Sequence, residues 1–176
     1  MRISRRCECG SSTPLIYLAK VDRLALVQQL DTSCVIPERV YEEVVETGLE
    51  QGYPDARCIE RSVDADRFAT ESVETTPLLS RLQDNSNLSD ADVAVLACAD
   101  AHDGVAVMDE TYGRDVAAAE GITTRGTAYL VLKLASEGTI GVDEARSVID
   151  AMVDEGWYCA PDVYAKIVQK LDSLAD

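Results

Sequence analysis

Short apolar segments that alternate with longer amphipathic segments constrain the fold of this chain most. Cys34-Val35-Ile36 and Val105–Met108 are too short for helices and are interpreted as buried strands. Helical patterns lie between the strand-like segments, as parallel strands require. The sequence therefore predicts an α/β fold, a three-layer α/β/α sandwich around a small, mostly parallel sheet. At 176 residues, the chain is expected to form a single domain, 1–176.

The expected helices follow an apolar repeat of about 3.6 residues. Pro14 fits the first turn of the first helix, and Thr13 or Ser12 is expected to cap it. Pro37 opens the second helix. A further brief strand is expected at 122–125. The expected helices are 14–30, 38–48, about 56–68, 77–84, 91–101, 112–120, 127–135, 142–155 and 161–174.

The charge is strongly acidic, with 32 acidic against 16 basic residues and a net charge of −16. The acids are spread among regular apolar positions, so they belong to a folded surface and not to a disordered tail. Such a surface resembles those of proteins from salt-loving archaea, where salt screens self-repulsion; an ordinary acidic protein is the alternative. The charge neither supports nor excludes an RNA substrate, because counterion release contributes little in molar salt.

The six cysteines show no paired CxxC spacing, and the chain has one histidine, His102. A structural zinc site needs four closely grouped ligands, and the sequence offers no such group. Cys34 and Cys98 lie in apolar runs and are expected to be small buried hydrophobes. His102 is expected at the surface. Without a secretory signal or an apolar run near the ~20 residues that span a bilayer, the protein is expected in the reducing cytoplasm.

Carboxylates stand where functional residues gather in a parallel sheet, just beyond the strand ends. Glu43 lies on the second helix, Asp92 begins another helix, and Asp109-Glu110 follows a strand. Converging carboxylates repel one another unless a cation binds, and oxygen ligands favour Mg²⁺ or Mn²⁺. Such a centre activates water for phosphodiester hydrolysis. In so acidic a chain, a solvated acidic surface remains the alternative interpretation.

The segments with recognisable motifs are 13–20, 36–44, 88–97, 107–121, 126–127, 135–138 and 156–157. In this order they resemble the PIN-domain family of VapC-type toxin ribonucleases. The resemblance implies an endoribonuclease of toxin–antitoxin type that depends on Mg²⁺ or Mn²⁺. Its metal-binding and catalytic acids would be Glu43, Asp92 and Asp109, supported by Glu110. Arg114, Ser11 and Thr13 would contact the substrate, although Arg114 could instead pair with an acid. A small antitoxin and a second copy of the chain are the implied partners.

The N-terminus departs from the family pattern. The family has an Asp at the end of its first strand, where this chain has Ser11, and the residues up to Gly10 offer no apolar core for a central strand. Residues 1–11 are therefore an atypical N-terminus. A replaced N-terminus, a catalytically silent module that binds RNA or protein, and substitution by Glu8 are the three explanations. Losing one catalytic carboxylate typically costs orders of magnitude in rate.

Overall fold

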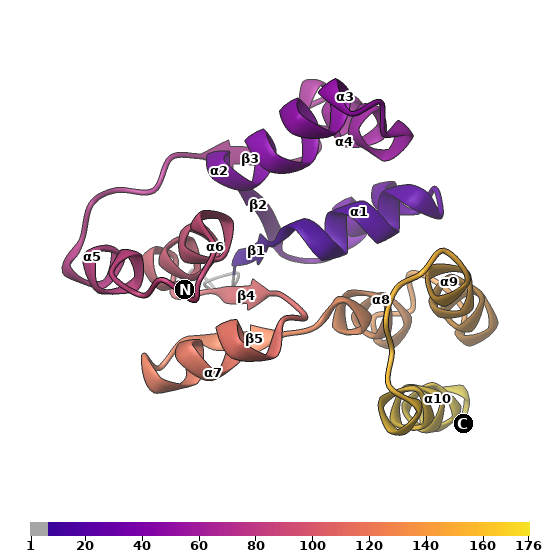
Figure 1. The fold of residues 1–176 in the computed structure, drawn as a ribbon. Coiled ribbons are helices and arrows are strands. Elements are labelled where there is room, and N and C mark those ends of the chain that lie inside the picture. The colour runs from indigo at the N-terminus through magenta and orange to yellow at the C-terminus, as the bar shows by residue number, and fades with distance from the viewer. Residues whose placement is uncertain (1–6) are drawn as a thin grey trace, which may run out of the picture.

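Five parallel strands form one sheet at the centre of the computed structural model, which describes residues 7–176 (Figure 1). The strand order is β3-β2-β1-β4-β5, so β1 lies in the middle and pairs with both β2 and β4. The prediction of a three-layer α/β/α sandwich is confirmed. The strands are β1 Cys7–Gly10, β2 Ser33–Pro37, β3 Ala69–Glu71, β4 Val105–Val107 and β5 Thr123–Arg125.

Helices cover both faces of this sheet. Helix α6 packs against β1, β2 and β4 on one face, with α2 and α5 beside it. Helices α1 and α8 lie on the other side, and α9 and α10 pack onto α8 (Figure 1). The helices are α1 Ser12–Lys20, η1 Leu24–Gln29, α2 Glu38–Tyr41, η2 Glu42–Thr47, α3 Gly48–Glu50, α4 Pro54–Asp64, α5 Pro77–Gln83, α6 Asp90–Ala101, α7 Thr111–Ala119, α8 Thr127–Ser136, α9 Val142–Asp154 and α10 Pro161–Ala175.

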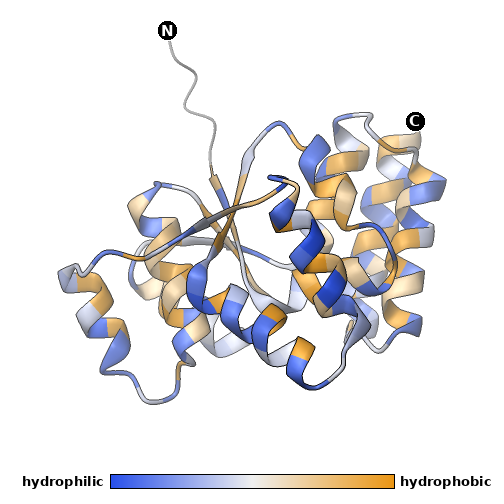
Figure 2. Ribbon diagram, turned by 90° about the horizontal axis from the view of Figure 1, so that it is seen from above, coloured by the Kyte–Doolittle hydropathy of each residue, from blue (hydrophilic) through white to orange (hydrophobic). Residues whose placement is uncertain are grey.

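Most helices carry one apolar and one polar side, visible as orange and blue flanks in Figure 2. The apolar sides meet in a single core that includes Leu18, Ile36, Leu96 and Leu134, each at most 2% exposed. Burying a large apolar side chain contributes about 1.5–3 kcal/mol, so this core holds the helices on the sheet. Among residues 7–176, no helix combines the length and apolar character that crossing a bilayer requires.

Three local predictions were wrong. The expected helix 14–30 is divided, because Asp22 adopts a positive φ of 55° after α1 and a 3-10 helix, η1, follows. The residue at the N-cap of α1 is Ser11, not Thr13 or Ser12, and its side chain makes no capping bond. Strand β3 was not expected, because Ala69-Thr70-Glu71 has no apolar run.

The expectation that the N-terminal residues cannot form a central strand is also wrong from Cys7 onward. Cys7, Glu8 and Cys9 are all buried in β1. The Sγ of Cys9 lies 3.1 Å from that of Cys98 on α6, whereas Glu8 pairs with Lys133 on α8. Thiols on one face and a buried ion pair on the other thus replace the usual aliphatic side chains. The part of this expectation that concerns residues 1–6 lies outside the described residues.

Candidate functional site

Ser11 lies at the point where β1 ends, beside the end of β4. Its backbone N–H donates to the carbonyl oxygen of Val107 at 3.0 Å, which continues the pairing of these two strands. Asp109 follows β4 by two residues. Ser11 is buried. The two central strands therefore deliver Ser11 and Asp109 to the same edge of the sheet, as predicted for functional residues of a parallel sheet.

Asp92 stands in the first turn of α6, where Ser89 caps the helix. The backbone N–H of Asp92 donates to Ser89 Oγ at 3.0 Å. Burial raises the pKa of the Asp92 carboxyl, a hydrogen bond with Ser89 opposes this rise, and the negative charge of Glu110 adds to it. Glu110 is therefore close enough to act on Asp92 electrostatically. The starts of α6 and α7 bring these two acids together.

Both carboxylate oxygens of Glu110 cap α7. Oε1 accepts the backbone N–H of Tyr112 at 3.0 Å, and Oε2 accepts that of Gly113 at 2.6 Å. An added Cβ on Gly113 would lie 3.0 Å from Oε2 and 2.9 Å from Met108 Cε, so glycine permits this close approach. Glu110 thus stabilises the start of α7 as a helix cap. Each of its carboxylate oxygens retains a further lone pair that can bind another partner.

Asp109 is fixed by three donors from the C-terminal part of the chain. Its Oδ1 accepts the backbone N–H of Thr127 at 2.7 Å. Its Oδ2 accepts the Thr127 hydroxyl at 2.6 Å and Trp157 Nε1–H at 2.9 Å. Asp109 thereby caps α8, whose N-cap residue Gly126 has no side chain to do so. Three of its roughly four lone-pair positions are used, which leaves about one for a cation.

Thr127 and Trp157 hold the Asp109 carboxylate, and the prediction of the site did not include them. The Gly126-Thr127 and Gly156-Trp157 segments belong to the resemblance, but nothing in their spacing tells which acid they hold. Thr127 is fully buried and Trp157 nearly so. Their hydrogen bonds to Asp109 connect residues 18 and 48 positions apart, a distance that local patterns do not reveal.

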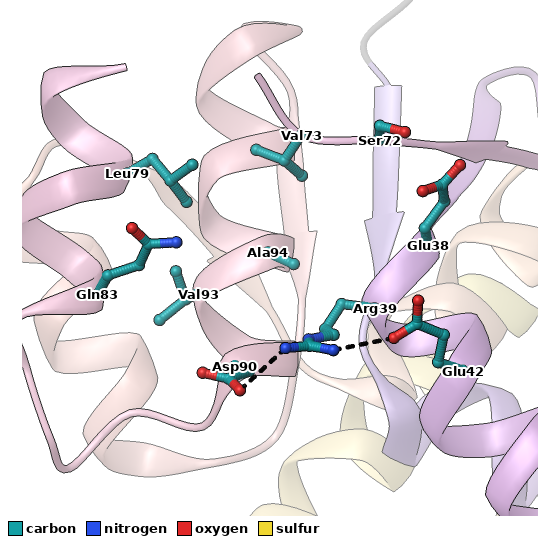
Figure 3. A pocket seen from close by; sticks show the side chains of 10 residues that line it. All are labelled: Glu38, Arg39, Glu42, Ser72, Val73, Leu79, Gln83, Asp90, Val93 and Ala94. Carbon is teal, nitrogen blue, oxygen red and sulfur yellow. Dashed lines mark hydrogen bonds and ion pairs between the residues drawn. The ribbon is translucent and has the colours of Figure 1, made fainter. Parts of the chain in front are cut away.

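Glu43 lies in η2, a π-helical segment that interrupts the helix running from Glu38 to Glu50. Its side chain is exposed. Single π-helical turns are frequent at functional sites. Its neighbour Glu42 accepts from Arg39, which also reaches Asp90 at the start of α6 (Figure 3). This bridge holds η2 and the start of α6 together beside a cavity of about 290 Å³.

The three predicted acids do not close around a point. In the described residues 7–176, Glu43, Asp92 and Asp109 are not a group whose carboxylate oxygens lie within 4.8 Å of one another. The group that meets this distance is Glu71, Cys98 and His102, from β3 and the end of α6. The sequence indicated no group of four zinc ligands, and this group of three was not anticipated, because Glu71 reaches Cys98 and His102 only through the fold.

The predicted substrate-contacting residues frame the same edge. Arg114 is exposed on α7, and its Nη1 lies 3.7 Å from the position that a Cβ on Gly126 would occupy. The same position is 2.9 Å from Asp109 Oδ1, so Arg114 lies near that carboxylate. Thr13 is half-buried in the first turn of α1. Contact of Ser11, Thr13 and Arg114 with a substrate stays a prediction.

Comparison with known proteins identifies the family. A solved structure, a domain of a functionally unknown protein from Methanocaldococcus jannaschii DSM 2661, matches with 17% identity over 69% of this chain and 90% of that chain, at a TM-score of 0.43. No match is found among curated proteins. The family model described as DUF3368, a PIN domain, matches residues 10–173. Because this match spans nearly the whole chain, the protein belongs to the PIN-domain family DUF3368.

Proposed function

We propose that this chain is a metal-dependent endoribonuclease that hydrolyses RNA phosphodiesters. The PIN-domain family to which it belongs consists generally of nucleases. The observation that carries the proposal is the arrangement of Asp92, Asp109 and Glu110 around the ends of β1 and β4. The donors are all carboxylate oxygens, which fit Mg²⁺ or Mn²⁺ and not softer metals. When bound, such a cation supplies activated water and neutralises charge on the leaving oxygen.

Each acid has a distinct role in this proposal. Asp109 is the fixed ligand, because Thr127 and Trp157 hold its carboxylate in one orientation. Asp92 is the ligand whose affinity depends most on pH, because burial raises its pKa and protons compete with the cation. Glu43 is exposed on η2 and is the remaining acid that the family resemblance assigns to the centre. Glu110 supports the centre by its negative charge while it caps α7.

Arginine supplies the contacts to RNA in a chain with a net charge of −16. Arg114 lies beside Asp109, where a guanidinium can bind a phosphate through paired hydrogen bonds. Ser11 and Thr13 offer hydroxyls at the edge of the same site. In high salt, stacking and hydrogen bonding contribute more to RNA binding than phosphate contacts do, because screening weakens the latter.

A second candidate function is a catalytically silent PIN module that binds RNA or a protein. Two observations favour it. Ser11 stands where the family has an Asp, and a hydroxyl cannot supply the charge of that ligand. The carboxylate of Asp109 already accepts three hydrogen bonds, so little of it remains for a cation. Both observations predict weak binding of Mg²⁺ and Mn²⁺.

Calorimetry with Mn²⁺ at high salt, on this chain and on Ser11→Asp, tests the site. Binding by both proteins supports the nuclease, and binding by Ser11→Asp alone supports the silent module. If neither protein binds Mn²⁺, the carboxylates do not form a metal centre, and this result would contradict both the proposed site and the hydrolysis mechanism.

Cleavage of single-stranded and structured RNA with Mg²⁺ or Mn²⁺ tests the activity. We expect Asp92→Asn to abolish cleavage, because it removes a ligand charge but keeps the shape of the side chain. Asp143→Asn is the matched control, since Asp143 is an exposed acid in the first turn of α9 and loses the same charge at a helix start. Cleavage that persists in EDTA would contradict a metal mechanism.

The biological setting that we propose is a toxin–antitoxin pair of VapC type in the cytoplasm of a salt-loving archaeon. A small antitoxin would mask the carboxylates, and the chain would act as a homodimer. Six free cysteines agree with a reducing compartment. Light scattering at high salt tests the dimer, and copurification with the product of a neighbouring small gene tests the antitoxin; a monomer without such a partner would contradict this setting.

A further inference from the structure

A second cluster of potential metal ligands lies at the opposite end of α6 from Asp92. Cys98 and His102 are four residues apart on this helix, so their side chains share one face. The carboxylate of Glu71, at the end of β3, lies 2.5 Å from His102 Nε2. The ligand atoms of Glu71, Cys98 and His102 are all within 4.8 Å of one another. His102 is roughly 15 Å along the helix axis from Asp92, so the two sites are separate.

Strand β1 brings two further thiols to this cluster. Cys7 and Cys9 are two residues apart on a strand, so both side chains face α6. The Sγ of Cys9 lies 3.1 Å from Cys98 Sγ and 3.9 Å from Cys7 Sγ. Cys9 is fully buried between the other two thiols.

Cys7 and Cys9 thus lie beside Cys98 but are not part of the group whose ligand atoms lie within 4.8 Å of one another. In each of the two sulfur–sulfur contacts, either thiol can be the donor.

We propose that Cys98, His102 and Glu71 bind one zinc-class divalent cation with tetrahedral geometry, the fourth position being taken by water. Thiolate and imidazole ligands select such a cation over Mg²⁺. Bond lengths of about 2.0–2.3 Å place neighbouring donors of tetrahedral zinc roughly 3.4–3.8 Å apart. The 2.5 Å contact between Glu71 and His102 must therefore open by about 1 Å, which the partly exposed side chain of Glu71 allows.

The surroundings suit entry of an ion from solvent. A cavity of about 310 Å³ is lined by Glu71, Cys98 and His102 together with the segment that leaves β3. The imidazole and the carboxylate are both partly exposed, whereas the thiol of Cys98 is buried beneath them. The bound cation would join β3 and the end of α6, two elements far apart in the sequence. It would therefore stabilise the fold without taking part in hydrolysis.

Cobalt is the spectroscopic probe for this site, because thiolate ligation gives an intense near-ultraviolet absorption and tetrahedral geometry gives strong visible bands. The reduced, metal-stripped full chain is titrated with Co²⁺ and then with Zn²⁺. We expect one Co²⁺ per chain, both absorption features, and displacement by one equivalent of Zn²⁺. A six-coordinate spectrum without the thiolate absorption would overturn the proposal.

Substitutions identify the ligands. Cys98→Ser should remove most of the thiolate absorption. His102→Gln should weaken Zn²⁺ binding by at least about 10- to 100-fold, because substituting even a residue that only hydrogen-bonds to a metal ligand lowers the affinity by that factor. His102→Gln changes an exposed residue, so the variant should fold even if Cys98→Ser does not. Zn²⁺ should raise the melting temperature of the unaltered chain but not of His102→Gln.

Two controls complete the experiment. Cys58→Ser removes a half-buried thiol on α4 and should leave the spectrum unchanged. Asp92→Asn should also bind Co²⁺ normally, which separates this site from the proposed nuclease centre. Unchanged binding in both Cys98→Ser and His102→Gln, or loss of binding in Cys58→Ser, would refute the assignment of these three ligands.

Discussion

Removing the partner of Glu8 should strongly destabilise the fold, because Glu8 is a buried charge at the centre of the sheet. Glu8 is 3% exposed, and Lys133 Nζ donates to its Oε1 at 3.0 Å. The second oxygen, Oε2, is buried without a hydrogen-bond partner. After Lys133→Met, the remaining donor is the Tyr129 hydroxyl, which lies 3.5 Å from Oε1. The carboxylate would then be almost wholly uncompensated.

The expected loss of stability follows from the charge left without a partner. Removing one partner of a buried ion pair typically costs about 3–5 kcal/mol. We therefore expect Lys133→Met to lose about 4 kcal/mol, or roughly 8–16 °C in melting temperature for a chain of this size.

Urea unfolding followed by circular dichroism at fixed KCl measures this loss, with Lys166→Met as control. Lys166 is an exposed lysine on α10, and its substitution should change stability by no more than about 0.5 kcal/mol. The double variant Glu8→Met/Lys133→Met should regain the stability of the unaltered chain or exceed it, because replacing a whole buried pair is often neutral or stabilising. A double variant as unstable as Lys133→Met would refute the argument from charge and point to packing.

Three further predictions concern other parts of the molecule. Trp157→Phe should cost about 1.5–3 kcal/mol in urea unfolding, because it removes a hydrogen bond to the charged carboxylate of Asp109; an unchanged midpoint would contradict this. The hydrogen bond and charge of Arg81 lower the pKa of Glu120 from its usual 4.5, so this pair contributes stability above pH 4.5 that is lost as the pH falls through the lowered pKa. Glu120→Gln should therefore show a shallower loss of stability in acid than the unaltered chain. Finally, the melting temperature should rise between about 0.1 M and about 2 M KCl, because salt screens the repulsion of a chain with net charge −16; a fall would contradict that reasoning.

The fold could be predicted largely from the sequence because most of its elements carry a strong periodic signal. Helices α6, α9 and α10 have clear apolar stripes and begin and end within one or two residues of their predicted limits. Strand β1 was not predicted, because its side chains are thiols and a carboxylate, and their partners lie on α6 and α8. A strand whose burial depends on such distant partners leaves no local pattern.

The two candidate sites differ in how far the sequence reveals them. Asp92, Asp109 and Glu110 of the proposed nuclease centre stand at strand and helix ends, which local patterns do locate. The proposed zinc-class site joins residues 71, 98 and 102, and their only regular spacing is the four residues from Cys98 to His102. Glu71 joins them because the end of β3 meets the end of α6 through its contact with His102. Sequence spacing does not report that packing.

The partners of β1 bear on the three explanations for Ser11. If the N-terminus had been replaced by accident, β1 would pack against residues suited to the aliphatic side chains of an ordinary central strand. Instead, Glu8 meets Lys133, 125 residues away, and Cys9 meets Cys98, 89 residues away. Glu8 points to α8 in this pairing, which argues against its acting as the missing ligand at the strand end. The side chains of residues 7–10 therefore fit their neighbours in the fold. This fit favours the explanation in which Ser11 belongs to the natural sequence and the proposed metal centre is weakened or silent. A double-mutant cycle on Glu8 and Lys133 measures this fit directly: a coupling energy near zero would restore the replaced N-terminus as an explanation.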